Sequence, residues 1–316
     1  MTDSSDNQSN QKTSISRPMV IGEVLFDCFP DGNAVLGGAP FNVAWHLQGF
    51  GLSPLMVSSV GNDKHGERVL KLMQLWNMDT SAMQTDKVHP TGQVTVSVHD
   101  GQPDYDIRAD QAYDHIQYPP LQKVVMQHKD QQSDFSMMYH GSLLTRTPHS
   151  RQVLDQLQSD IAVKSFVDVN LRPPWWSRDD IDRSLRQASW VKLNEDELLS
   201  LMQVDNNNSD GLFEHAKAMQ QQYKLDLLVV TQGEMGAFCI SPDDMISGSP
   251  VEVEVVDTVG AGDAFSSVVI LGLTQQWSLS IILERALEFA ARICQQRGAT
   301  RVDQAMYERC LSRWTA

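Results

Sequence analysis

The sequence predicts an α/β protein built on a mostly parallel sheet with helices on both faces. Two observations predict this class. Short apolar runs of strand length alternate along most of the chain with segments of helical periodicity, and near the C-terminus a valine-rich run leads through a glycine-rich turn into an apolar helix. Such alternation is typical of strand–helix–strand units, in which helices cover a parallel sheet.

The composition fits a globular protein and limits its partners. The 316 residues include 25 Lys and Arg against 40 Asp and Glu, which gives a formal net charge of −15. So acidic a surface disfavours nonspecific binding to nucleic acid and to anionic membranes, although backbone N–H groups can still make a locally positive pocket. Hydrophobic residues make up 41% of the chain, enough for a buried core without disulfides or metals.

The N-terminal segment and the cysteines favour a cytoplasmic protein. Residues 1–17 are polar, lack the apolar core of a signal peptide, and are expected to form a disordered tail. No apolar run approaches the roughly 20 residues of a membrane helix. The cysteines are far apart and form no CxxC pair, which disfavours a zinc site or a disulfide framework. They are Cys28, Cys239, Cys294 and Cys310.

The first elements are signalled by an apolar run and a glycine pair. Residues 18–27 are predicted to form one buried strand, because they are almost continuously apolar. The Gly-Gly-Ala-Pro segment at 37–40 then starts a helix, since proline suits the first helical turn. Gly49 and Gly51 end that helix.

The alternation continues through the middle of the chain. Strands are predicted at 55–60, 166–169, 190–193 and 225–230, and helices at 66–73, 195–201 and 212–223.

One segment breaks this rhythm. Residues 93–99 alternate polar and apolar side chains, Asp100-Gly101 is a hairpin turn signal, and residues 105–108 resume an extended pattern. This predicts a small antiparallel sheet that is half exposed, inserted from about 30–38 and 91–110. It is either a surface hairpin or a lid that closes over a substrate.

The glycine-rich turn carries the chemistry. A half-exposed strand is predicted at 251–255, and an apolar helix follows Gly260 and Gly262. The first N–H groups of a helix lack partners and, with the helix dipole, make an anion site that glycines leave open. Asp263 falls in the first turn. It is either a base for a hydroxyl that attacks phosphorus or an acidic residue that the helix dipole favours.

Other nucleotide and hydrolase motifs do not occur. The sequence contains no GxxxxGK[ST] loop, no GxGxxG after an early strand, no HExxH and no GxSxG. A P-loop site, a dinucleotide fold, a zinc protease and an α/β-hydrolase are therefore disfavoured.

Several motifs together resemble a known family. Residues 257–263 match the D-T-x-G-A-G-D signature of the ribokinase-like sugar kinases, the phosphofructokinase-B family. Asp27 and the segment 37–44 resemble the N-terminal glycine signature of that family in its fructokinase form. Further family-like elements stand in order between them, at 61–66, 168–173, 192–197 and 231–236. The resemblance covers residues 18–312.

The resemblance implies a three-layer ribokinase-like fold with a small β-sheet lid, and an ATP-dependent carbohydrate kinase. The acceptor would be a primary hydroxyl of a sugar. D-fructose is the first candidate because 37–40 and 170–174 are fructokinase-like. The alternatives are 2-keto-3-deoxygluconate and ribose. A non-catalytic sugar or nucleotide sensor on the same fold is a different class that stays open.

The resemblance also implies roles for particular residues. Asp263 would be the general base, and the N–H groups of Gly260, Ala261 and Gly262 would hold the charge of the transferring phosphoryl group. The candidates for sugar binding are Asp27, Gly38, Asn42, Arg108, Asn170 and Arg172. Some of these side chains have plainer alternatives. Asp27 fits a solvated turn, Asn42 a helix start, Arg108 an exposed edge charge and Arg172 an ion pair.

The nucleotide and the cations complete what the resemblance implies. The candidates for ATP binding are Asn194, Glu197, Thr231, Gly233, Gly236 and Gly262. Asn194 and Glu197 would organise water and Mg²⁺ near the phosphates. Asp257 and the carbonyl of Val259, with the loop at 298–299, resemble a monovalent-cation site, and the need for K⁺ stays open. Pairing of two copies through their lids and a monomer are equally allowed.

Overall fold

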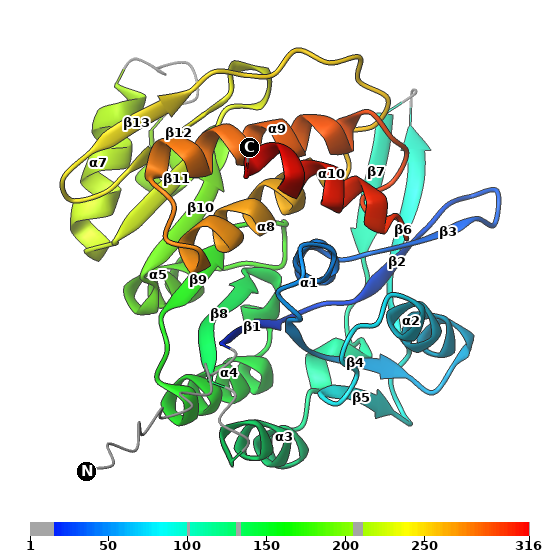
Figure 1. Cartoon of the computed structure of the whole chain (residues 1–316). Coiled ribbons are helices and arrows are strands. Elements are labelled where there is room, and N and C mark those ends of the chain that lie inside the picture. The colour runs from blue at the N-terminus through cyan, green and yellow to red at the C-terminus, as the bar shows by residue number, and fades with distance from the viewer. Residues whose placement is uncertain (1–15, 100–101, 131–133, 205–210, 316) are drawn as a thin grey trace, which may run out of the picture.

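A computed structural model describes residues 16–99, 102–130, 134–204 and 211–315. Its centre is a nine-stranded sheet with strand order β13-β12-β11-β10-β9-β8-β1-β4-β5 (Figure 1). The strands from β11 to β5 along this order run parallel, and β12 and β13 are antiparallel. The strands are β1 (Arg17–Ile21), β4 (Leu55–Gly61), β5 (Met83–Asp86), β8 (Phe135–Gly141), β9 (Ser165–Asp168), β10 (Trp190–Asn194), β11 (Leu227–Thr231), β12 (Ala237–Ile240) and β13 (Met245–Gly248).

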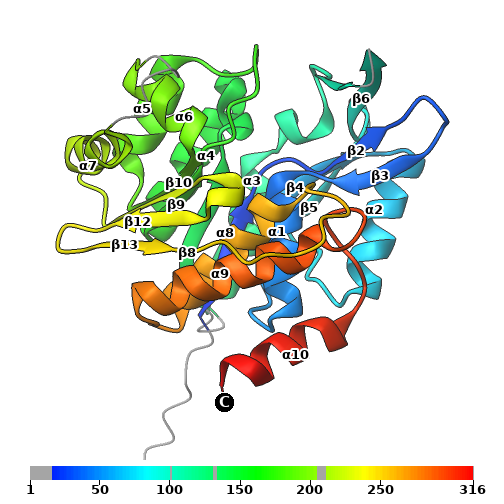
Figure 2. The same cartoon turned by 90° about the horizontal axis from the view of Figure 1, so that it is seen from above.

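Helices cover both faces of the sheet, so the molecule has the three layers that the sequence predicts (Figure 2). One face carries α1 (Ala39–Gly49), α2 (Lys64–Leu75), α8 (Ala261–Thr274), α9 (Leu279–Cys294) and α10 (Gln304–Trp314), whose apolar side chains share one buried cluster. The other face carries α3 (Tyr118–Asp130), α4 (Pro148–Ile161), α5 (Arg178–Gln187), α6 (Glu195–Met202) and α7 (Leu212–Tyr223), packed in two further clusters.

A second sheet stands beside the first, with strand order β3-β2-β6-β7. Its strands are β2 (Leu25–Cys28), β3 (Ala34–Gly37), β6 (Gly92–His99) and β7 (Gln102–Ile107). Both segments that the sequence assigns to the inserted sheet contribute to it, and β2 joins them. The expected wholly antiparallel pairing is wrong in one place, because β2 and β6 run parallel. Of the tail predicted over 1–17, residues 1–15 lie outside the described residues, as does the turn at 100–101. The tail prediction is wrong at its end, because Arg17 is the first residue of β1.

The first predicted strand is two strands in two sheets. The sequence predicts one strand over 18–27, but β1 ends at Ile21 and β2 begins at Leu25. Gly22 lies between them with φ +154°, and a Cβ there would stand 2.4 Å from Pro40 Cγ. Hydrophobicity does not reveal this break, because the run stays largely apolar on both sides of Gly22, and Leu25 and Phe26 of β2 are as buried as β1.

The strand expected at 251–255 does not form. β13 ends at Gly248, and the following Pro250 has no N–H to donate to a sheet. Val251 and Val255 are 43% and 59% exposed, so the alternating valines do not mark a buried face. The predicted helix after the glycines is confirmed as α8. In the described part of the chain, no helix is long and apolar enough to cross a membrane.

Candidate active site

The glycine-rich turn leads directly into α8. Gly260 is its N-cap residue, with φ +81°, and a Cβ at this position would lie 2.3 Å from the Cβ of Ala299. Only glycine fits both conditions. The N–H of Ala261 donates to the carbonyl of Thr258 at 3.2 Å, whereas no hydrogen bond is found for the N–H groups of Gly260 and Gly262 among the described residues. Two donors at the helix start are thus available to an anion.

Asp263 follows in the first turn of α8 and meets the start of α1. The side-chain amide of Asn42 donates to Asp263 Oδ2 at 2.8 Å. Burial raises the pKa of Asp263 to about 6, and this hydrogen bond works in the opposite direction. A carboxylate with such a pKa is a weak base that is ionised at neutral pH.

Gly38 is the N-cap of α1 and fixes how closely the chain passes the β1–β2 connection. Its φ is +106°, and a Cβ there would stand 2.6 Å from the carbonyl oxygen of Glu23. A side chain at Gly38 would therefore push α1, and with it Asn42, out of place.

Asp27 lies on β2, in the second sheet, and not at the end of the single first strand that the sequence predicts over 18–27. The split of the first strand at Gly22 is the reason. Burial raises the pKa of Asp27, and the nearby guanidinium of Arg172 lowers it. The side chain is half-buried, so it is not a fully solvated turn residue.

Arg172 is one of the cations that act on these carboxyl groups. Burial raises the pKa of Asp27, Asp263 and Glu23, and the positive charge of Arg172 opposes that rise in each of them. The three carboxyl groups come from β2, α8 and the β1–β2 connection. Its guanidinium also donates to Asn170 Oδ1 at 3.3 Å. The structure thus brings Asp27, Asp263, Asn170 and Arg172 to one side of the molecule, at the carboxyl end of β9.

Arg108 lies at the end of β7 on the second sheet. Its guanidinium is exposed and contacts Thr95 Oγ1 at 3.3 Å through both Nε and Nη2. Its charge lowers the pKa of the Cys28 thiol, which burial raises. Arg108 therefore stands beside the strand that carries Asp27, and in the described chain no hydrogen bond or ion pair joins it to Asp27 or Asp263.

A buried ion pair supports the glycine turn from below. Lys192 Nζ donates to Asp168 Oδ1 at 3.0 Å, and both side chains are almost fully buried. Asp168 Oδ2 also accepts from Ser266 at 2.6 Å and from Tyr139 at 3.1 Å. A Cβ on Gly262 would lie 3.2 Å from Lys192 Nζ, so the ammonium group is directly under the turn. Lys192 is the first residue of the family-like element at 192–197, but no role was predicted for it, although a lysine inside an apolar strand signals a buried charge.

The candidates for ATP binding lie at the carboxyl ends of β10 and β11. Asn194 caps α6 by accepting from the N–H of Glu197 at 2.8 Å. Glu197 accepts from the N–H groups of Asn194 and Leu171, both at 2.9 Å, so its carboxylate is engaged as a cap. Thr231 ends β11, and its hydroxyl is 3.5 Å from the carbonyl of Leu193.

The two remaining glycines of this set shape the turn after β11. Gly233 begins a short 3₁₀ turn, and Gly236 ends it with φ +94°. A Cβ on Gly236 would meet the carbonyl of Gly248 at 2.4 Å. Close backbone packing against β13 is therefore reason enough for glycine at 236.

Asp257 ties the glycine turn to a second loop. Its Oδ1 accepts from the N–H of Val259 at 3.0 Å and its Oδ2 from the N–H of Gly298 at 2.9 Å. The loops at 257–260 and 298–299 are thus held together next to the N-terminus of α8.

Three further buried polar groups near the site were missed by sequence reasoning. They are Glu23, Tyr113 and Arg146. Glu23 Oε2, Tyr113 OH and Arg146 Nη1 have no hydrogen-bond partner in the described part of the chain. Burial raises the pKa of Glu23 to about 7. The acidic residue in the apolar run 18–27 is a sequence signal for Glu23, whereas the other two are brought near it only by the fold.

Comparison with known proteins identifies the relatives of the chain. Residues 29–305 match the pfkB family of carbohydrate kinases. A fructokinase from Salmonella typhimurium is 27% identical over 260 residues, which is 78% of this chain and 80% of that protein.

Solved structures agree with the fold. A fructokinase with bound ATP from Xylella fastidiosa superposes with a TM-score of 0.81 at 18% identity, covering 96% of this chain and 100% of that one. A fructokinase from Vibrio cholerae in a fructose-, ADP- and potassium-bound form gives 0.76 at 23% identity, covering 94% and 99%. A 2-dehydro-3-deoxygluconokinase from Thermotoga maritima gives 0.78 at 16% identity, also covering 94% and 99%. The family predicted from the ordered motifs is confirmed: the chain belongs to the pfkB family of carbohydrate kinases.

Proposed function

We propose that this carbohydrate kinase transfers the terminal phosphoryl group of ATP to a primary hydroxyl of a sugar, and that D-fructose is its acceptor. One observation carries the phosphoryl transfer, and the similarity to a fructokinase over 260 residues favours fructose. Asp263, whose pKa burial raises to about 6, stands in the first turn of α8 beside two glycines with available N–H groups and is held by Asn42 at 2.8 Å. A base and an anion site are thus adjacent.

Asp263 is the general base of this proposal. It accepts the proton of the sugar hydroxyl while that oxygen attacks the γ-phosphorus in line with the bond to ADP. Phosphoryl transfer passes through a loose transition state, so a base of ordinary carboxylate strength is sufficient. Proton removal of this kind contributes about 10²–10⁴-fold to the rate.

The start of α8 stabilises the charge on the transferring group. The N–H groups of Gly260 and Gly262, together with the helix dipole, favour negative charge at that point. The N–H of Ala261 also donates to Thr258 O in this structure, at 3.2 Å, so it would turn to the phosphoryl group only when ATP is bound.

The sugar is held between the second sheet and the N-termini of α1 and α8. Asp27, Asn42, Asn170 and Arg172 offer acceptors and donors for hydroxyl groups, and Gly38 keeps Asn42 in place by letting α1 start close to the Glu23 carbonyl. The second sheet, with Arg108, acts as the lid and excludes water, which would otherwise compete as the acceptor.

The nucleotide lies over the carboxyl ends of β10 and β11. Asn194, Thr231, Gly233 and Gly236 line its phosphates, and Glu197 acts by holding Asn194. Both Glu197 oxygens are engaged by backbone N–H groups, so the residue fits a bound Mg²⁺ through water and not as a direct ligand. Magnesium would supply positive charge between the phosphates.

A monovalent cation fits the loops that Asp257 joins. The Asp257 carboxylate accepts from both loops, and this leaves the carbonyl of Val259 and the 298–299 backbone as oxygen donors of the kind that K⁺ takes. The potassium-bound form of the Vibrio cholerae fructokinase supports a monovalent cation in this kinase.

The acceptor is tested with a panel of sugars. ADP release is followed with ATP, Mg²⁺ and D-fructose, 2-keto-3-deoxygluconate or D-ribose, and ³¹P NMR identifies the phosphorylated carbon. The proposal expects the highest kcat/KM with fructose and a phosphate on a primary carbon. A higher kcat/KM with 2-keto-3-deoxygluconate, the substrate class of the Thermotoga maritima neighbour, would make that sugar acid the acceptor in place of fructose. No sugar-dependent ADP release would favour a sensor.

A further inference from the structure

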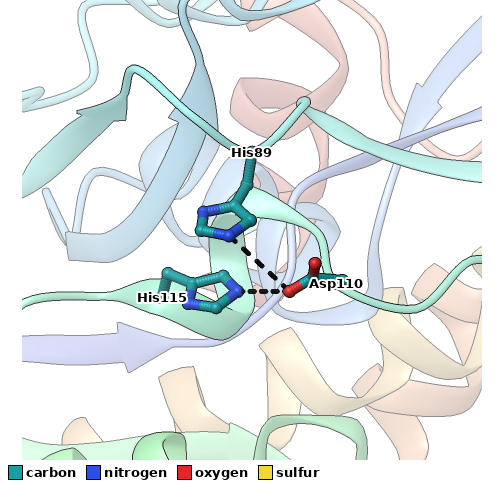
Figure 3. A group of neighbouring side chains, drawn as sticks. All are labelled: His89, Asp110 and His115. Carbon is teal, nitrogen blue, oxygen red and sulfur yellow. Dashed lines mark hydrogen bonds and ion pairs between the residues drawn. The ribbon is translucent and has the colours of Figure 1, made fainter.

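A cluster of two histidines and an aspartate lies at the base of the β6–β7 hairpin. His89 precedes β6, Asp110 follows β7, and His115 ends the short 3₁₀ helix η1 (Ala112–His115). One ligand atom from each residue lies within 4.8 Å of the other two. Figure 3 shows both imidazole rings directed at the same carboxylate of Asp110.

We propose that His89, Asp110 and His115 form a binding site for a dication of the Zn²⁺ class, with His89 Nε2, His115 Nε2 and Asp110 Oδ1 as ligands. The distance from Asp110 Oδ1 is 2.7 Å to His115 Nε2 and 3.6 Å to His89 Nε2. Ligands about 2.0–2.1 Å from a tetrahedral metal stand a little over 3 Å apart, which lies between these two values. Imidazole and carboxylate are ligands that zinc takes.

A second carboxylate supports His89 from behind. Asp86 Oδ2 lies 2.8 Å from His89 Nδ1, and Asp86 Oδ1 accepts from the N–H groups of Val88 and His89 at 2.7 and 3.0 Å. This arrangement leaves the proton of the neutral imidazole on Nδ1 and the Nε2 lone pair free for a metal. A carboxylate on the far nitrogen of a histidine is a frequent second partner of zinc ligands.

Local changes suffice for the ion to enter. The two rings are stacked at 3.5 Å, with an angle of 5° between their planes, so they must tilt for both lone pairs to converge. The metal replaces the proton shared by His115 and Asp110, and that proton leaves to water. The Asp110 side chain is 73% exposed, so an ion can reach the site and water can fill a fourth position.

The site would join the two ends of the predicted lid. His89 lies three residues before β6 and Asp110 three residues after β7, so a bound ion links both ends of the hairpin. Arg108 stands two residues before Asp110. This inference does not rest on the identity of the sugar or on Asp263.

Zinc binding by the whole chain tests the site. Isothermal titration calorimetry with ZnCl₂, in a reduced sample without nucleotide, is expected to give one equivalent bound by the wild type. His89→Gln and His115→Gln remove ligands and should each weaken binding at least about 100-fold, and Asp86→Asn about 10–100-fold. His215→Gln, on α7, is the matched control and should bind like the wild type.

Further measurements keep the test decisive. Co²⁺ should give the spectrum of nitrogen and oxygen ligands without thiolate charge transfer, which separates this site from the free cysteines. If a histidine variant fails to fold, Asp110→Asn replaces it, because Asp110 is highly exposed. Wild-type affinity in the ligand variants, or no binding by the wild type, would overturn the proposal.

Discussion

The side-chain amide of Asn42, on α1, donates a hydrogen bond of 2.8 Å to the carboxylate of Asp263, which lies 221 residues later on α8. This hydrogen bond fixes the first turn of α1 against the first turn of α8. Because the amide stabilises the ionised carboxylate, it keeps the pKa of Asp263 from rising further on burial.

The first prediction is a pH profile that Asn42 controls. A base must be ionised to act, so kcat/KM should fall tenfold for each pH step below the pKa of Asp263, which is about 6. Replacing Asn42 with Leu removes the donor and should move this acidic limb to higher pH. The measurement is kcat/KM between pH 5 and 9. A limb at the same pH in Asn42→Leu would contradict the role of the hydrogen bond.

The second prediction concerns sugar affinity. Asp27→Ala should weaken sugar binding at least about tenfold, because a charged hydrogen bond to a hydroxyl contributes about 1.5–3 kcal/mol. Nucleotide affinity should not change. Calorimetry with each ligand separates the two effects, and Asp31→Ala, at an exposed residue in the turn between β2 and β3, is the control. Equal loss for sugar and nucleotide would point to misfolding and not to recognition.

The third prediction concerns stability and the buried Glu23. Its pKa is about 7 in the folded protein against 4.5 for the ordinary group. The unfolded chain therefore loses this proton at lower pH than the folded one, and the stability that the neutral form contributes is lost as pH rises from about 4.5 to 7. This loss is of order 3 kcal/mol.

Glu23→Gln stays neutral at every pH. The free energy of unfolding of the variant minus that of the wild type should therefore be larger at pH 8 than at pH 5. Urea unfolding at the two pH values measures the difference, and Glu308→Gln, an exposed glutamate on α10, is the control. A pH-independent difference would show that Glu23 does not titrate there.

The fourth prediction concerns the ion pair under the glycine turn. Lys192→Met leaves Asp168 buried without its cation and should reduce the free energy of unfolding by about 3–5 kcal/mol. The double variant Lys192→Met with Asp168→Asn should recover a large part of that loss. Denaturant unfolding of the three proteins gives the comparison, and no recovery in the double variant would contradict charge as the cause.

The sequence predicts the layers of the fold because the hydrophobic periodicity of each strand and helix is a local property of the sequence. Each strand and helix around 190–201 and 212–230 carries its own apolar pattern, and the elements that form there agree with that pattern. The break between β1 and β2 is different. The run 18–27 stays largely apolar across Gly22, whose φ of +154° and close approach to Pro40 are set by the tertiary structure.

The site is predictable only where a motif is contiguous. The turn at Gly260 and Asp263 is visible in the sequence because helix N-termini and glycines have a direct physical meaning. Lys192 and Asp168 are 24 residues apart and form a pair only through adjacent strands. The His89 and His115 rings stack because both ends of the β6–β7 hairpin come together, which no local pattern reveals.

Asp263→Asn tests the central claim most directly. The amide keeps the shape of the side chain and can still accept from Asn42, but it cannot take a proton. Calorimetric affinities for ATP and sugar should stay within about twofold of the wild type, while kcat falls at least about 10²-fold. Asp243→Asn, an exposed aspartate, should behave like the wild type. Near-normal turnover by Asp263→Asn would contradict the account.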